Sequence, residues 1–472
     1  MPLPPIDSNP IVVTTSRLPE FKESAPASVT VIDKELIQHL GEPLVPALLR
    51  LVPSTSVTVS GPDGSLTEVR IRGAEANHTL LFIDGIRAND PATGDQPRFD
   101  LLNADIASRI EVVRGPQSAL WGSDAIGGVV AVNGTPPVGT EWSAALEGGS
   151  FGFERISAAA SWSSDRASLA AAFGGQRATG IDSFSGHGDK DGYRNLSARV
   201  DGRYRLGPLL ELDASGFALS GRSDFDGFDP VTFVHADTLD NSRNRMAAGR
   251  LWADIGSATE PWSGQVSGSL LGSSNRNYLA SAFLNRTSGT RRTVGAQAEH
   301  RFTTGPVAQI LVAAAESERE TFQAGDLLYG GATDQKRNRT HNSLTLEWRA
   351  KASLVTTDVA IRRDMFNRFR DATSLRASLL AKLGDGFDLT GAYAEGIAQP
   401  TFFDLYGFYP GSFVGNPSLR PESSRGFEVS VRYHGDFFLA SLTAYRQRLH
   451  DEIIDIYDPL TFVSSTINGT GT

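Results

Sequence analysis

The most informative segment of the sequence for the fold is residues 109–132, Arg109-Ile-Glu-Val-Val-Arg-Gly-Pro-Gln-Ser-Ala-Leu-Trp-Gly-Ser-Asp-Ala-Ile-Gly-Gly-Val-Val-Ala-Val132. The pattern predicts a strand over 110–113, a turn at 115–116, a short helical piece, and a second strand over 129–132. The glycine pair at 127–128 marks a bend before that strand. Three charges, Arg109, Glu111 and Arg114, lie in this apolar run, and a buried charge is costly unless it is paired. The segment therefore pairs its charges internally or faces a wet, charged wall.

Composition excludes several classes of protein. The chain has 472 residues, no cysteine and a net charge of −10. Thiol catalysis, disulfides and thiolate metal sites are excluded, and the acidic balance argues against a nucleic-acid binder. No apolar run is long enough for a transmembrane helix. No nucleophile elbow or phosphate loop is present and the histidines are scattered, so we expect no enzyme.

Residues 28–134 predict a small α/β unit. Strands are expected over 28–31, 57–60, 68–72 and 79–83, and a second helix over 44–51. Asp33 is the expected N-cap of a first helix over 34–40, which Gly41 ends. Asp84 and Gly85 are typical of a tight hairpin turn.

From residue 141 the sequence alternates. Leu344, Leu346 and Trp348 fall on one face of 343–350, with Thr345 and Glu347 on the other. Densely charged polar faces, short turns and long polar loops predict a transmembrane barrel, in which every backbone group is paired. A soluble β-rich protein, which would also alternate, is the alternative, and solubility without detergent would support it.

Three segments in order, Val69-Arg-Ile-Arg-Gly73, Leu81-Phe-Ile-Asp-Gly85 and residues 109–132, strongly resemble the plug of TonB-dependent outer-membrane receptors. The resemblance covers nearly the whole chain, including residues 416–422. It implies an all-β, antiparallel transmembrane barrel, nominally of about 22 strands, with an N-terminal α/β plug inside its lumen. The plug argues against a passive porin.

The expected domains are a disordered N-terminus over 1–27, a plug over 28–137 and a barrel over 138–472. We count roughly sixteen barrel strands against about 22 in filled transporters. We therefore expect a fragment that lacks about six C-terminal strands and has aggregation-prone edges. The start, Met1-Pro-Leu-Pro-Pro5, does not resemble a signal peptide. For an exported protein, the signal would then lie outside this sequence, or the start would be misassigned.

Residues 11–17 are similar to the TonB box of this family. An extended segment without a partner in its own fold can add as a strand to another protein's sheet. A first edge strand of the plug is the alternative reading. The expected TonB-binding residues are Ile11, Val12, Val13, Thr14 and Thr15.

Two glycine- and aspartate-rich plug loops, 60–65 and 89–96, correspond to loops that form the floor of the ligand site in the family. Flexible turns are the alternative reading. The expected ligand-binding residues are Ser60, Asp63, Ser65, Asn89, Asp90, Asp95 and Gln96.

Charged plug residues are expected to contact the charged inner wall of the barrel, where a wet polar interface can be remodelled. The alternative is ordinary solvated charge. The residues are Arg70, Arg72, Glu111 and Arg114.

Aspartates cluster in two barrel loops, over 180–193 and 221–245, and hard oxygen ligands suit Ca²⁺. Cobalamin receptors of the family order their loops with calcium in this way. Solubilising acidic loops are the alternative. The expected metal ligands are Asp182, Asp189, Asp191, Asp224, Asp226 and Asp240.

The resemblance implies TonB-dependent active transport across the outer membrane of a Gram-negative bacterium. We expect a monomer, embedded in outer-membrane lipid, that carries cobalamin. A ferric siderophore is the alternative ligand. TonB, energised from the inner membrane, is the expected partner.

Overall fold

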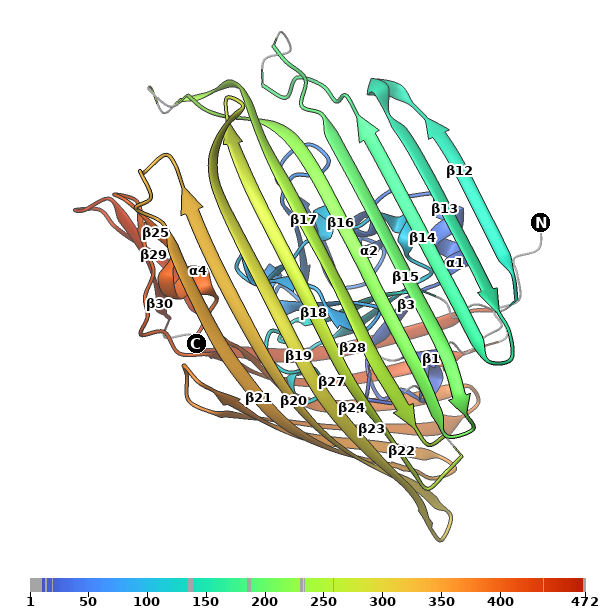
Figure 1. Ribbon diagram of the computed structural model, residues 1–472. Coiled ribbons are helices and arrows are strands. Elements are labelled where there is room, and N and C mark those ends of the chain that lie inside the picture. Colours follow the sequence, from blue (N-terminus) through green and yellow to red (C-terminus); the bar gives the residue numbers. More distant parts are fainter. Residues whose placement is uncertain are drawn as a thin grey trace.

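The computed structural model describes residues 11–12, 15–18, 20–134, 139–184, 188–229, 232, 234–257, 259–435 and 437–469. A small domain from the N-terminal part of the chain lies within the curve of one large sheet (Figure 1). No helix in these ranges is long and apolar enough to cross a membrane.

The plug is built on a five-stranded sheet in the order β3-β10-β11-β6-β7. Strands β11 and β6 run parallel, and the other neighbours are antiparallel. The strands are β3 (Val29–Ile32), β6 (Thr79–Ile83), β7 (Ile86–Arg87), β10 (Arg109–Arg114) and β11 (Gly128–Asn133). The strands predicted from residues 109–132 and 79–83 are thereby confirmed.

Local signals in the plug sequence act as expected. Helix α1 (Lys34–Leu40) is capped by Asp33, which accepts a 2.8 Å hydrogen bond from the Leu36 N–H, and it ends at Gly41 with a φ of 66°. Asp84 and Gly85 both have positive φ, 46° and 74°, as a two-residue type I′ hairpin turn requires.

The remaining elements of the N-terminal region complete the plug. Helix α2 is shorter than the predicted 44–51. The hairpin β4–β5 carries the loop 60–65, and β8–β9 carries the second predicted loop. The bounds are β1 (Ile11–Val12), β2 (Glu20–Phe21), η1 (Lys22–Ser24), α2 (Val45–Leu49), β4 (Thr55–Val59), β5 (Thr67–Ile71), η2 (Ala76–His78), β8 (Asn89–Asp90), β9 (Gln96–Pro97), η3 (Phe99–Leu101), η4 (Ala104–Ile106) and α3 (Ser118–Trp121).

An apolar core fills the plug and extends to the wall. Leu81, Phe99 and Val112 are fully buried in one cluster, which also contains Phe217 and Leu271 of the large sheet. The plug therefore has apolar contacts with the barrel in addition to its polar ones, here and in a smaller cluster of Ala119, Leu120 and Ala360.

The large sheet contains 15 strands, each antiparallel to its neighbours, against the roughly sixteen expected. No pairing within the described ranges joins its first and last strands, β12 and β28. The strands are β12 (Glu141–Gly148), β13 (Glu154–Ser163), β14 (Ala167–Ala178), β15 (Tyr193–Gly207), β16 (Leu210–Phe228), β17 (His235–Ile255), β18 (Trp262–Leu279), β19 (Ala282–Thr304), β20 (Val307–Asp326), β21 (Gln335–Lys351), β22 (Val355–Phe366), β23 (Ala372–Gly384), β24 (Phe387–Ala398), β27 (Glu422–His434) and β28 (Leu439–His450).

Four more strands form a separate sheet in the order β25-β26-β30-β29, beside α4. It lies at the end of the barrel where the long connections are found (Figure 1). The bounds are η5 (Ser150–Gly152), α4 (Phe402–Tyr406), β25 (Phe408–Tyr409), β26 (Phe413–Val414), β29 (Ile453–Asp458) and β30 (Val463–Asn468).

The outer face of the large sheet is apolar and its inner face is polar, which is the reverse of the arrangement in a soluble protein. On β21, Leu346 is 59% exposed on the outer face, whereas the neighbouring Glu347 faces the lumen and its side chain is 1% exposed. An apolar outer face and a charged inner face are what a transmembrane barrel requires.

Candidate functional site

The N-terminal segment pairs with its own chain. Ile11 and Val12 form β1, which is antiparallel to β2. Thr15 is buried and donates a 2.5 Å hydrogen bond to Glu20. The expectation that this segment lacks a partner in its own fold is therefore wrong, because β2 supplies one. Val13 and Thr14 lie outside the described residues, and TonB binding by residues 11–15 stays a prediction.

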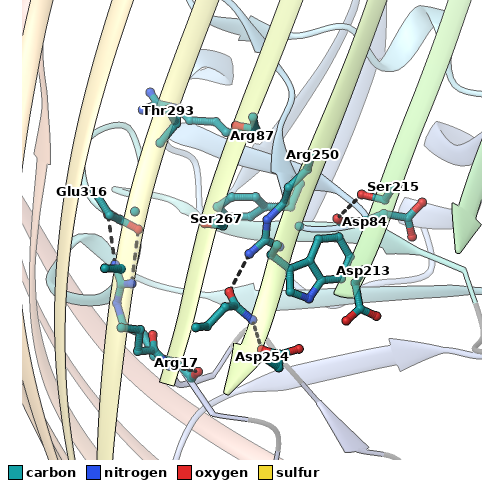
Figure 2. A pocket seen from close by; sticks show the side chains of 18 of the residues that line it. Arg17, Asp84, Arg87, Asp213, Ser215, Arg250, Asp254, Ser267, Thr293 and Glu316 are labelled. Carbon is teal, nitrogen blue, oxygen red and sulfur yellow. Dashed lines mark hydrogen bonds and ion pairs between the residues drawn. The ribbon is translucent and has the colours of Figure 1, made fainter. Parts of the chain in front are cut away.

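Arg17 joins three parts of the molecule. Its guanidinium lies 3.1 Å from Glu316 on β20 (Figure 2). It also donates a 2.8 Å hydrogen bond to the carbonyl of Leu120 in α3. It also lies 5.6 Å from the centre of the Trp121 ring. Glu316 is held in turn by Arg362 of β22 at 2.9 Å. Displacing Arg17 would therefore remove a contact that the N-terminal segment shares with the plug helix and the barrel wall.

A second polar cluster joins the plug loop 89–96 to the wall. Asp95 lies 3.1 Å from Arg291 on β19 and 2.6 Å from Arg339 on β21. Glu320 on β20 pairs with both arginines, and all four side chains are buried. Arg339 also donates a 2.8 Å hydrogen bond to the carbonyl of Pro400. The cluster thus links the plug to the connection that leads into α4.

Other residues of this loop bond within the protein. Asn89 accepts a hydrogen bond from the Leu81 N–H at 2.8 Å. Asp90 accepts hydrogen bonds from Ser273 and Asn275 of β18. Asn89, Asp90 and Asp95 are buried, and Gln96 is half-buried. The structure gives the three buried residues structural contacts, and ligand binding by this loop stays a prediction.

The loop 60–65 is more open. Ser60 and Asp63 are exposed and Ser65 is half-buried. Gly64, with a φ of 85°, packs so closely on Tyr193 that an added Cβ would lie 2.1 Å from the ring. The contact with the start of β15 places the loop toward the long connections, and its ligand contacts stay a prediction.

Of the four predicted plug–barrel charges, Arg72 makes the expected contact. It pairs with Glu428 of β27 and lies 4.1 Å from the ring centre of Tyr445. Arg70 instead pairs with Glu68 at 2.8 Å, because residues two apart in a strand share a face.

The other two charges also bond inside the plug. Glu111 pairs with Arg109 at 2.6 Å, and Arg114 donates to Thr30 at 2.8 Å. The sequence pattern around 109–114 is thus explained by pairing within β10 and with β3.

A buried histidine adds a further plug–barrel contact. His78 Nε2 lies 2.5 Å from Glu422, the first residue of β27. Burial lowers the pKa of His78, but the hydrogen bond and charge of Glu422 outweigh it and raise the pKa above its usual value. Glu422 also accepts a 2.7 Å hydrogen bond from the Ile453 N–H, which extends the link to β29.

The sequence analysis did not single out Arg17, Glu316, Arg291 or Arg339. A signal was present in Glu316-Ser-Glu-Arg-Glu320, where acidic residues recur at every second position of a predicted barrel strand. Such spacing places them on one face, and the structure shows that this face is the lumen.

A cavity of about 680 Å³ lies between the plug and the wall at the end with the short turns. Its lining residues include Arg17, Asp84, Arg250 and Glu316 (Figure 2), together with Trp121. The Arg17 contacts therefore border a space that already separates plug and barrel.

The aspartate loops bring together part of the predicted set. One carboxylate oxygen each from Asp189, Asp226 and Asp237 lies within 4.8 Å of the others. Burial, with the adjoining Asp237 carboxyl, raises the pKa of Asp189 to about 6. Three carboxylates, one from the loop after β14 and two from the ends of β16 and β17, match the hard oxygen donors that Ca²⁺ prefers.

The other predicted aspartates have protein partners. Asp182 accepts from Phe184 N–H at 2.9 Å, Asp191 from Ser183 N–H at 2.9 Å, and Asp240 from Ala280 N–H at 2.7 Å. Asp224 pairs with Arg222 at 2.7 Å. Asp237 was not among the predicted ligands, because the packing of the loop that carries Asp189 against the start of β17 cannot be read from loop composition.

Two family models match the chain: the TonB-dependent Receptor Plug Domain over residues 22–129, and the TonB dependent receptor-like β-barrel over 141–472. The chain is 26% identical over 463 residues to the "Vitamin B12 transporter BtuB" of Vibrio vulnificus (strain YJ016), covering 94% of this chain and 70% of that protein. It is 27% identical over 498 residues to the "Iron-regulated outer membrane virulence protein" of Vibrio cholerae, covering 98% and 72%.

Solved structures share the fold. The siderophore receptor PirA from Acinetobacter baumannii superimposes with a TM-score of 0.76 at 17% identity, covering 95% of this chain and 77% of that one. The ferric enterobactin receptor PfeA from Pseudomonas aeruginosa, as its Q482A mutant, gives 0.74 at 16%, covering 93% and 76%. The two family models together span the plug and the barrel wall, and the chain belongs to the TonB-dependent receptor family.

Proposed function

We propose that this TonB-dependent receptor carries cobalamin across the outer membrane of a Gram-negative bacterium. Ligand would bind at the end with the long connections, on the loop 60–65 and the neighbouring barrel loops. The cobalamin assignment is supported by the carboxylate group of Asp189, Asp226 and Asp237, together with the similarity to vitamin B12 transporters.

The Arg17 contacts carry the proposed coupling. TonB would capture residues 11–15 by strand addition, in competition with the pairing to β2. Withdrawal of the segment would remove Arg17 from Glu316 and from the Leu120 carbonyl. Helix α3 would then lose one of its ties, while Ser118 still accepts a 3.0 Å hydrogen bond from the Ile397 N–H of β24. Movement of α3 at the edge of the existing cavity would require these remaining contacts to yield as well, and would open a route for ligand. The proposed activity is transport of the ligand, and no covalent step is required.

Calcium would act as an organiser of the outer loops. Asp189, Asp226 and Asp237 would hold the ion, which joins the loop after β14 to the ends of β16 and β17. The ion would supply positive charge between carboxylates that otherwise repel. We expect the receptor to work as a monomer in outer-membrane lipid, with TonB as its partner.

A ferric siderophore is the second candidate. Aromatic side chains gather near α4, where Phe402 stacks on Phe322 at 5.5 Å and Phe403 stacks on Phe413 at 4.6 Å between ring centres. Arg337 lies 4.7 Å from the Tyr406 ring centre. Aromatic and cationic groups at the ligand end suit an anionic, aromatic chelate.

The deciding experiment measures cyanocobalamin binding to the receptor in outer membranes, with and without a calcium chelator, and with ferric siderophores as competitors. Asp237→Asn should weaken binding about as much as chelation does. The matched control is Asp224→Asn, because Asp224 pairs with Arg222. This variant should bind cyanocobalamin normally. Siderophore binding without cobalamin binding would select the second candidate, and binding of neither would contradict both ligands.

A further inference from the structure

A second group of carboxylates lies inside the barrel, at the opposite end from the aspartate loops. Glu211 and Asp213 on β16 and Asp254 on β17 each place one carboxylate oxygen within 4.8 Å of the others. Glu211 and Asp254 are direct partners in the antiparallel register. Like charges directly opposite each other destabilise a sheet, so this arrangement needs positive charge between the strands.

The protein's own cations cover one side of the group. Arg203 on β15 lies 3.0 Å from Glu211 and 2.8 Å from Asp213, and its side chain is half exposed. Arg205 on the same strand lies 3.4 Å from Glu211. On the other side, Arg250 donates to Gln265 at 2.8 Å, and the Gln265 amide donates to Asp254 at 2.8 Å. Asp254 thus accepts a hydrogen bond from a neutral amide.

Asp213 provides an independent indication of a ligand. The residue is 5% exposed, and its Oδ2 has no hydrogen-bond partner among the described residues, while Oδ1 meets Arg203. Leaving a buried carboxylate oxygen without a partner is costly, and a bound ion is one arrangement that satisfies it. Asp213 and Asp254 both line the 680 Å³ cavity, where water ligands have room (Figure 2).

We propose that Glu211, Asp213 and Asp254 bind a divalent cation that prefers oxygen ligands, of the Ca²⁺ or Mn²⁺ kind. The ion ties β16 to β17 beside the short turns and sets the charge of the cavity wall across from Arg17. It is separate from the loop group, because Asp226 lies 13 residues further along β16 (226 − 213), or roughly 40 Å at about 3.3 Å per residue.

Terbium luminescence can detect this site selectively. Tb³⁺ replaces Ca²⁺ at oxygen sites, and its emission is sensitised by a nearby tryptophan. Trp252 is the cross-strand partner of Asp213 and lines the same cavity. Residues 179–251, which include the loop aspartates, contain no tryptophan. Tryptophan-excited emission that is lost in Trp252→Phe therefore reports the lumenal group.

The experiment uses the full chain in detergent. The purified receptor should show tryptophan-excited Tb³⁺ emission that Ca²⁺ displaces, and Trp252→Phe should remove most of that emission. Asp254→Asn and Glu211→Gln should each raise the Kd for Tb³⁺ at least tenfold. The matched control is Glu299→Gln, in the same cavity, where Glu299 accepts from Ser263 at 2.9 Å; its Kd should be unchanged.

Two results would overturn the proposal: no Tb³⁺ emission from the wild-type receptor, or emission with an unchanged Kd in both Asp254→Asn and Glu211→Gln. Two carboxylate variants are included so that a failure of one to fold leaves the other to decide. Asp237→Asn separates this site from the loop group, since it should leave the tryptophan-excited emission intact.

Discussion

Inside the plug, Val112 and Val130 face each other across β10 and β11 in a fully buried apolar cluster. At the boundary with the barrel, by contrast, Asp95 is held between Arg291 and Arg339. Breaking apolar packing exposes apolar surface to water, which is costly. The charged groups of an ion pair can instead bond to water or to other charges. We therefore expect the plug interior to stay folded during transport, whereas the contacts at its boundary with the barrel can be rearranged.

The largest effect is expected in the plug interior. Phe99→Ala removes a fully buried ring and should lower the free energy of unfolding of the plug by about 3–5 kcal/mol. Limited proteolysis and denaturant unfolding would measure it. Leu346→Ala, on the outer face of β21, is the control, and an equal loss there would contradict the contrast.

A smaller loss is expected at the boundary. Arg339→Ala leaves Asp95 and Glu320 with Arg291 alone, and removing one partner of a buried pair costs roughly 3 kcal/mol. The plug should stay folded but seal the barrel poorly, so vancomycin should enter cells faster.

Arg363→Ala is the control for Arg339→Ala, because Arg363 pairs with Asp371 at an exposed site. Its effect on vancomycin entry should be negligible. A tight seal in Arg339→Ala would show that the boundary does not depend on this cluster.

Release of the N-terminal segment should respond to Arg17. In a Thr15→Cys background, Arg17→Ala should speed maleimide labelling about tenfold, equivalent to about 1.4 kcal/mol, because the links to Glu316 and Leu120 are lost. Arg155→Ala breaks a different plug–barrel pair, with Asp105, and serves as control. Equal labelling rates in Arg17→Ala and Arg155→Ala would show that Arg17 does not control release of the N-terminal segment.

The smallest effect is expected from pH. The pKa of His78 is raised in the folded protein, so its pairing with Glu422 contributes stability fully below the unfolded pKa of about 6.5. That contribution is lost as pH rises through the raised, folded value. Unfolding of the wild type and of His78→Gln from pH 5 to 9 should converge at high pH, and parallel curves would contradict the assignment.

Much of the fold could be predicted because local signals decide it. Asp33 and Gly41 delimit α1, Asp84 and Gly85 make the turn between β6 and β7, and alternation identifies the barrel strands. The pairing of β1 with β2 and the sheet formed by β29 and β30 could not be predicted, because short strands pair wherever tertiary structure provides an edge.

The site was predictable only in part, for a related reason. Arg72 was recognised from its plug motif, whereas Asp95, Arg291 and Arg339 meet only once barrel register and plug position are set. The same applies to Asp237, which joins Asp189 across a loop and a strand. Composition indicates which groups carry charge, and the three-dimensional register decides their partners.

The central claim is that transport rearranges the plug boundary while the plug interior stays intact. Because the chain has no cysteine, introduced pairs can lock each region in turn. Ser123→Cys with Gln399→Cys spans the boundary, where the Ser123 hydroxyl accepts from the Gln399 N–H at 2.9 Å. Val112→Cys with Val130→Cys spans the interior. TonB-dependent uptake of the radiolabelled ligand should stop in the first and recover with reductant, while the second transports normally. Uptake through the oxidised boundary lock, or its loss in the interior lock, would contradict the account.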